Sequence, residues 1–170
     1  MKTTLILLIS IALLGAGCST NQNLTNNTTN NPPTNSTTNQ AAEQPASGTS
    51  LDLSGKGLTS IPAYVFSMSN LEYLDLSNNK LTGAPQSQIG QLKNLKSLNL
   101  SENQLTGLPA ELGQLKKLET LNVSHNSLTG LPNELGNLTQ LKTFDVSGNS
   151  YSTQDLDGIA AKLTKTQIRH

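Results

Sequence analysis

Hydrophobic residues recur through the second half of the chain with a nearly constant period. Four segments begin at Leu71, Leu95, Leu118 and Leu141, with starts 24, 23 and 23 residues apart, and a truncated copy begins at Leu51. Apolar and polar residues alternate within each segment, which predicts a short β-strand. One copy cannot cover its own leucines, so we expect successive copies to stack with their strands parallel.

The segments follow the pattern L-x-x-L-x-L-x-x-N-x-L and resemble the leucine-rich repeat family. The stretch LTGLPAELGQL, residues 105–115, resembles the short bacterial type of repeat. The resemblance implies an α/β solenoid. It would be a short horseshoe with a concave parallel sheet of about five strands and an irregular or 3₁₀ convex side. Gly90, Gly113 and Gly136 then read as packing residues of that convex side.

One asparagine recurs in every complete copy, at Asn79, Asn103, Asn126 and Asn149. In the family that the chain resembles, this asparagine is buried and bonds backbone groups of the turn and of the next repeat. A buried turn leaves backbone groups that need such partners. The resemblance therefore implies a structural role for this column. Lys56 stands there in the first copy, where we expect exposure.

The period changes after Asn149. Ser152 opens a helix-start pattern, and Leu156, Ile159 and Leu163 follow at helical spacing. We expect this helix to cap the open end of the last repeat, because a solenoid needs a polar-backed cover at each end. The segment 167–169 is a candidate for one more short strand.

The first residues predict export. Lys2 precedes an apolar stretch from Leu5 to Leu14, which is shorter than the roughly 20 residues of a membrane-spanning helix. Residues 1–17 therefore read as a signal peptide. Cys18 is the only cysteine, and the run up to it resembles a bacterial lipobox, which implies lipidation (palmitate) at Cys18 and anchoring in the cell envelope. The alternative is an ordinary signal peptide followed by an incidental cysteine.

The sequence divides into four parts. Residues 1–17 are the predicted leader, and residues 18–48 are an Asn/Thr-rich segment expected to be a disordered tether. The repeats occupy residues 49–150, and the C-terminal cap occupies residues 151–170. The 11 basic and 11 acidic residues balance, which gives no general electrostatic reason to expect nucleic-acid binding.

The expected binding surface is the concave face of the sheet. Its polar residues are Asp52, Tyr73, Asp75, Asn78, Asn99, Glu102, Asn122, His125 and Asp145. Beside them runs a uniform column of serines, which we expect to face water and to form a structural ladder more than a discriminating surface. We expect no lysine or arginine on this face, with Lys93, Lys116 and Lys117 on the opposite side. The face should then be weakly acidic and suit a basic or hydroxyl-rich partner.

Catalytic chemistry has little support in the sequence. His125 and Glu102 occupy one column and should approach to about 5 Å. Such a pair suggests either a metal or acid/base site or an exposed surface pair, and we favour the surface pair. No cofactor, metal or catalytic constellation is expected.

The resemblance implies a non-enzymatic, membrane-anchored module. It would bind a protein partner outside the cytoplasm through the concave face, and we expect a monomer. The alternative is a structural or glycan-associated protein of the envelope. An enzyme is a third, disfavoured reading.

Overall fold

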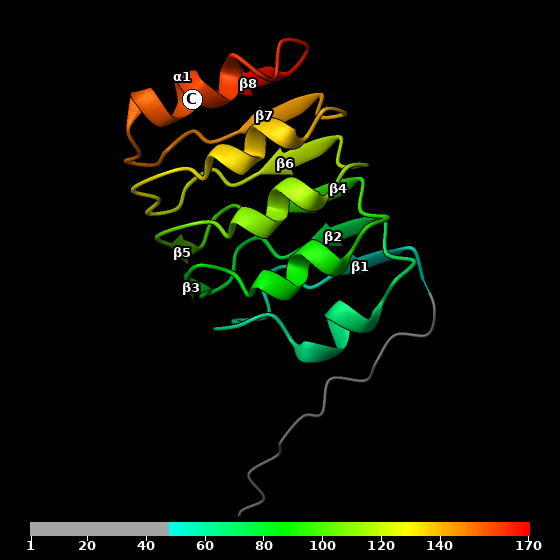
Figure 1. Cartoon of the computed structure of the whole chain (residues 1–170). Helices are drawn as coiled ribbons and strands as arrows, with labels where there is room; N and C mark the ends of the chain where they lie inside the picture. Colours follow the sequence, from blue (N-terminus) through cyan, green and yellow to red (C-terminus); the bar gives the residue numbers. More distant parts are fainter. Residues whose placement is uncertain (1–47) are drawn as a thin grey trace, which may run out of the picture. The chain divides into compact units, whose positions relative to one another are not determined.

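The computed structural model describes residues 48–170, which form one stack of repeats. Six short strands make a parallel sheet in chain order (Figure 1). They are β1 (Ser50–Asp52), β2 (Tyr73–Asp75), β4 (Ser97–Asn99), β6 (Thr120–Asn122), β7 (Thr143–Asp145) and β8 (Gln167–Arg169). The predicted parallel solenoid is confirmed. A second, two-stranded parallel sheet of β3 (Thr82–Gly83) and β5 (Gln104–Leu105) was not foreseen.

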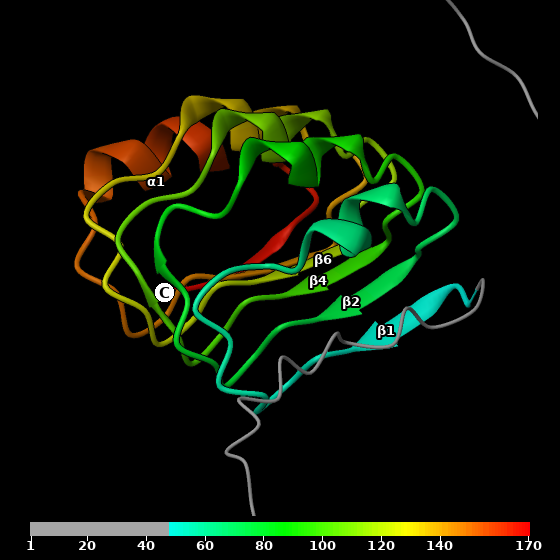
Figure 2. The same ribbon diagram turned by 90° about the horizontal axis from the view of Figure 1, so that it is seen from below.

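One 3₁₀ helix in each of the first four repeats lies opposite the six-stranded sheet and forms what we call the helix wall, as the resemblance to the short bacterial type of repeat predicted. These helices are η1 (Ala63–Ser67), η2 (Ser87–Gln91), η3 (Ala110–Gln114) and η4 (Asn133–Asn137). Figure 2 shows the helices along one side and the sheet along the other. The apolar core lies between these two walls.

The core forms because equivalent leucines of neighbouring repeats lie side by side. Leu74, Leu98 and Leu121 pair in register across β2, β4 and β6, and all three are buried. Burial of a leucine side chain is worth roughly 1.5–3 kcal/mol. Since each ring of leucines is covered by the repeats on both sides, that energy is available only when repeats stack.

Close packing of the 3₁₀ helices requires glycine at one position. A methyl group on Gly90 would lie 2.8 Å from the backbone oxygen of Glu111 in the next repeat. Gly113 faces Glu134 in the same way, and Gly136 faces the Lys162 side chain. The glycine column therefore sets how closely successive repeats approach.

The asparagine column satisfies buried backbone groups. Asn103 Oδ1 accepts a hydrogen bond from the Leu81 N–H at 3.0 Å, and its Nδ2 donates to the carbonyls of Leu76, Leu100 and Ser101. Asn79, Asn126 and Asn149 repeat this pattern. The inter-repeat bonds reach the preceding repeat, not the next one as the resemblance implied. Lys56, in the same column, is exposed as predicted.

The helix α1 (Thr153–Ala160) covers the C-terminal end. It begins where the sequence predicted, because the Ser152 side chain accepts a hydrogen bond from the Gln154 N–H at 3.2 Å. Leu156 and Ile159 are buried against the last repeat. The strand β8 then returns to pair with β7, and it completes the cover.

Replacing Gly90 by alanine should destabilise the stack. The new methyl group would overlap the Glu111 backbone, and such overpacking costs about 1–3 kcal/mol. Urea unfolding of the purified protein measures the change. Gly107→Ala is the matched control, since its methyl group would meet only Ala84 at 3.9 Å. Equal midpoints for the two variants would contradict this role of Gly90.

Replacing Asn103 by alanine should lower the free energy of unfolding by about 3 kcal/mol or more. The change leaves one backbone N–H and several carbonyls short of a partner, and each buried orphan costs about 1–3 kcal/mol. Asn137→Ala is the control, because Asn137 is exposed at the end of η4. A comparable loss of unfolding free energy in both variants would show that the hydrogen bonds of Asn103 do not stabilise the stack.

Candidate functional site

The best candidate site is the outer surface of the six-stranded sheet, which we call the strand face. Alternate residues of each strand project from it in two columns. The first column is Ser50, Tyr73, Ser97, Thr120, Thr143 and Gln167, and the second is Asp52, Asp75, Asn99, Asn122, Asp145 and Arg169. These registers bring together the strand residues that the sequence assigned to the concave face.

Side chains of the second column fold back onto the chain that follows each strand. Asp75 Oδ1 accepts hydrogen bonds from the Ser77 N–H at 2.8 Å and from the Ser77 hydroxyl at 2.6 Å. Asn99 and Asn122 accept from the N–H groups of Ser101 and Ser124 in the same way. This local bond fixes where each carboxylate or amide points.

The serine column is not the open surface that the sequence predicted. Ser101 is only 8% exposed and Ser124 only 6%. Ser77 and Ser147 are half-buried, and their hydroxyls donate to Asp75 and Asp145. The serines therefore support the second column and do not offer contacts to a partner.

A third column forms the rim of the strand face. Asn78, Glu102 and His125 have φ of 53°, 54° and 53°, in the left-handed region, and their side chains are exposed. Their backbone N–H groups donate to the following repeat, as from Glu102 to the Ser124 carbonyl at 3.0 Å. The turn thus presents these side chains at the edge of the face on which the sequence analysis placed them.

Glu102 and His125 lie in neighbouring repeats at the rim and are not bonded to each other in the structure. Among residues 48–170 no hydrogen bond or ion pair joins them, and no three His, Cys, Asp or Glu side chains gather as potential metal ligands. The His125 ring instead lies against the backbone of Gly148.

The charge of the strand face differs from the prediction at its C-terminal end. The strand β8 places Arg169 beside Asp145, with Nη1 3.8 Å from Oδ2. The expectation of a face without cations was therefore wrong. The missed signal was the period itself, since Ile168 follows Phe144 by 24 residues.

A row of alternating charges flanks the first column. Lys96 Nζ lies 2.9 Å from Glu72 Oε2, and Lys142 Nζ lies 2.6 Å from Glu119 Oε2. The hydrogen bond to Glu72 raises the pKa of Lys96. These lysines are matched by glutamates, so the row adds no net charge beside the face.

The acidic residues at the N-terminal end of the face are not matched in this way. No ion pair in the described region involves Asp52, Asp75 or Glu102. Hydrogen bonds from the Ser54 side chain and N–H lower the pKa of Asp52, and the charge of Lys56 adds a smaller effect in the same direction without forming an ion pair. The face is therefore acidic toward β1 and balanced toward β8.

A shallow groove crosses this acidic part. Its lining comes from three strands and consists of Ser50, Asp52, Tyr73, Leu74, Asp75, Ser97 and Asn99. The Tyr73 side chain is 47% exposed, the one large hydrophobic side chain so exposed within residues 48–170. An exposed aromatic beside two carboxylates gives the groove both an apolar contact and a charge.

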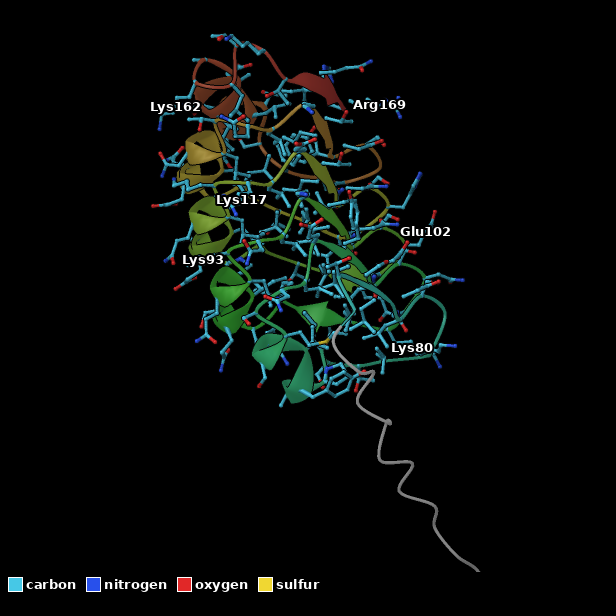
Figure 3. The ribbon with its side chains drawn as sticks, turned by 90° about the vertical axis from the view of Figure 1, so that its right-hand side faces the viewer. Lys80, Lys93, Glu102, Lys117, Lys162 and Arg169 are labelled. Carbon is cyan, nitrogen blue, oxygen red and sulfur yellow. The ribbon has the colours of Figure 1, made fainter. Side chains whose placement is uncertain are left out.

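Lysines gather on the opposite wall. Figure 3 shows Lys93 and Lys117 beside the 3₁₀ helices, whereas Glu102 extends on the other side. Lys93 Nζ donates to Gln114 Oε1 at 2.8 Å and Lys117 Nζ to Asn94 Oδ1 at 2.7 Å. Lys116 Nζ donates to the carbonyls of Gly113 and Asn137. As predicted, these cations lie away from the strand face.

Cys18, the predicted leader and the predicted tether lie outside the described residues. Within residues 48–170, no helix is long and apolar enough to cross a membrane.

Comparison with known proteins identifies the architecture. A family model described as a leucine-rich repeat region matches residues 50–165. A leucine-rich repeat protein of Leptospira interrogans has a similar solved structure, with a TM-score of 0.62 and 40% identity over 66% of this chain. Ectodomains of two Arabidopsis thaliana receptor kinases are also similar. GASSHO1/SCHENGEN3 gives a TM-score of 0.61 with 35% identity over 71% of this chain, and SOBIR1 gives 0.57 with 30% over 70%.

The match to these structures is partial. The chain covers 28% of the Leptospira protein, 15% of the GASSHO1/SCHENGEN3 ectodomain and 66% of the SOBIR1 ectodomain. No curated protein matches the chain significantly. The family model nevertheless spans every repeat that the structure shows, and the chain belongs to the leucine-rich repeat family.

Proposed function

We propose that this protein is a non-enzymatic interaction module, anchored to a bacterial membrane through Cys18, that binds a protein partner outside the cytoplasm through its strand face. The observation that carries the proposal is the groove around Tyr73, where an exposed ring lies among unmatched carboxylates. Complexes of two similar proteins supply the analogy. One is GASSHO1/SCHENGEN3 in complex with CASPARIAN STRIP INTEGRITY FACTOR 2, and the other is the Arabidopsis thaliana complex of BIR3 and SERK2, which has a TM-score of 0.55 and 36% identity over 60% of this chain.

The chemistry of the groove favours a basic partner segment. A lysine or arginine of the partner would meet the Asp52 and Asp75 carboxylates and the face of Tyr73 together. The face has few of the residue types that anchor tight protein complexes, since tryptophan is absent and the one arginine is Arg169. The proposed complex is therefore moderate in affinity and sensitive to salt.

Photo-crosslinking in intact cells tests the proposal directly. A light-activated residue in place of Ser97, beside Tyr73 on the face, should yield a discrete protein adduct. The same residue in place of Gln114, exposed at the end of η3, is the matched control. Adducts from Gln114 alone would move the binding surface to the helix wall. An adduct from Ser97 that glycan-degrading enzymes remove would instead favour the alternative, a glycan-associated envelope protein.

Removing the two carboxylates should weaken binding of the captured partner without unfolding the repeats. Asp52→Asn with Asp75→Asn should lower the affinity about tenfold and flatten its salt dependence, because each exposed charge pair contributes up to about 1 kcal/mol. Asparagine is tolerated there, since Asn99 and Asn122 already occupy the column with the same local bonds. Titration at several salt concentrations measures the change. Glu134→Gln with Asp157→Asn, exposed on the helix wall, is the control, and an equal loss there would refute a charge effect at the face.

Cys18→Ala should release the protein from membranes. Lipid chains hold a lipoprotein stably only when more than one is attached, and the cysteine is where they would be added. Fractionation of cells and metabolic labelling with palmitate measure anchoring. A labelled, membrane-bound Cys18→Ala protein would disprove the lipid anchor, and an unlabelled wild type in the soluble fraction would favour the ordinary signal peptide.

A further inference from the structure

Different elements lie at the two ends of the stack. At the C-terminal end, α1, β8 and the turn between them cover the last repeat, and most exposed residues of this cover are polar, among them Asp157, Lys162, Lys165 and Gln167. At the other end, β1 and η1 are the outermost elements of the described region (Figure 1). Within residues 48–170, the polar-backed cover that solenoids require is therefore present at the C-terminal end alone.

Apolar side chains are left half-buried at the end formed by β1 and η1, which we call the open end. Leu53 is half-buried, although its counterparts Leu76 and Leu100 are fully buried in the interior repeats. Met68 is likewise half-buried, whereas Leu92 in the same position of the next repeat is fully buried. The difference is that no repeat of the described region packs on the outer side of these two residues.

Tyr64 also stands where a neighbour would lie. Its counterparts in η3 and η4, Glu111 and Glu134, rest against glycines of the preceding helix. In η1 no described helix precedes Tyr64, and the side chain is half-buried. The open end therefore presents Leu53, Leu58, Tyr64 and Met68 as one apolar surface around the end of the core.

The strand β1 has a free backbone edge beside this surface. Leu53 N–H donates to the Asp75 carbonyl and Gly55 N–H to the Ser77 carbonyl, so the odd-numbered residues bond β2. Because backbone groups alternate sides along a strand, the N–H and C=O groups of Ser50 and Asp52 face outward. No strand in the described region pairs with them. An unpaired edge next to an apolar surface is a template for another strand.

The chain itself offers poor material to cover this end. Residues 19–47 contain no copy of the repeat pattern. Their apolar residues apart from prolines are Leu24 and three alanines, and Pro32, Pro33 and Pro45 lack the N–H that a strand needs. A second copy of the open end supplies both missing features, an apolar surface of the same kind and a free edge.

We propose that two copies of the protein associate through their open ends, with their β1 strands antiparallel about a two-fold axis at Leu51. In this arrangement Ser50 of each copy lies opposite Asp52 of the other, and the outward N–H and C=O groups of both residues form four hydrogen bonds. No like charges lie directly opposite. Leu51 points to the core in both copies, so the two leucine interiors become continuous and the sheet has twelve strands.

The pairing has a consequence for binding. A two-fold axis perpendicular to the sheet keeps both strand faces on the same side. The acidic grooves around the two Tyr73 side chains then lie near the centre of one extended face. A partner with two basic segments would gain avidity from such a pair. The sequence-based expectation of a monomer is replaced by this proposal, which stands whether or not the partner is a protein.

Crosslinking in cells tests the pair with the full chain. With Ser50→Cys, the two new thiols would be separated by the diagonal of an antiparallel pair, roughly 7–8 Å between Cα atoms. A short bis-maleimide should give a band of twice the chain's mass on a denaturing gel. Thr164→Cys, exposed at the capped end, is the matched control and should stay at the single mass.

A second variant tests the apolar contact. Tyr64→Lys in the Ser50→Cys background should abolish the doubled band, whereas Asp157→Lys at the capped end should leave it unchanged. Resistance to protease shows whether each variant is folded. The crosslink of Ser50→Cys alone tests the pairing even if one of the lysine variants is unfolded. A thiol at position 50 that maleimide labels but does not crosslink would overturn the proposal. So would a thiol that maleimide cannot reach, or an adduct with a different protein.

Discussion

Mutual burial of equivalent leucines is the constraint on which this structure depends. No repeat has an interior of its own, since its strand is three residues long and its 3₁₀ helix five. Such short elements are not stable alone. Each repeat is therefore held by its neighbours, and the quality of burial falls toward an end that lacks one. Leu98 and Leu121 in the middle of the stack are fully buried, whereas Leu51 and Leu53 at the open end keep some exposure.

Stacking at this spacing creates a second requirement. The tight turns after each strand are enclosed, so their backbone groups need partners other than water. The asparagine column meets the requirement with one side chain per repeat that bonds its own turn and the turn before it. The glycine column meets the corresponding requirement on the helix wall, where any side chain would hold the repeats apart. Leucine thus fills the core, asparagine bonds the enclosed backbone groups of the turns, and glycine allows the 3₁₀ helices to approach closely.

Much of the fold could be predicted because the period fixes the register. A strand that bonds its neighbour at an offset of 23 or 24 residues places every side chain in a column that can be read from the sequence. The column that contains Asp52, Asn99 and Asp145 could therefore be predicted from the period alone. The prediction was weaker where a residue's surroundings depend on a local bond. Ser101 and Ser124 occupy a polar column, but both are buried in the structure, and each N–H donates to the side chain two residues earlier.

Arg169 was missed for a different reason. The last strand carries no leucine motif, because Ile168 alone fills the core position and a helix replaces the usual 3₁₀ turn before it. Its register was still available from the spacing to Phe144. The ion pair with Asp145 matters for the site, since it removes one of the carboxylates on which an acidic face was predicted. Among residues 48–170, the carboxylates of the face without an ion pair are then Asp52 and Asp75 in the groove around Tyr73 and Glu102 on the rim.

The rim column shows how the fold leaves room for a specific surface. Every repeat needs a left-handed residue there, with φ between 53° and 67°, and glycine or asparagine meets that need at least cost. Gly55, Asn78 and Gly148 follow this rule, but Glu102 and His125 do not. A non-glycine residue in this region costs on the order of 1 kcal/mol or more. Nothing in the core requires a carboxylate or an imidazole at these positions, since both side chains are exposed and only their backbone N–H groups bond the next repeat. Glu102 and His125 therefore add strain that glycine would avoid, and they do so at the two rim positions nearest the middle of the strand face.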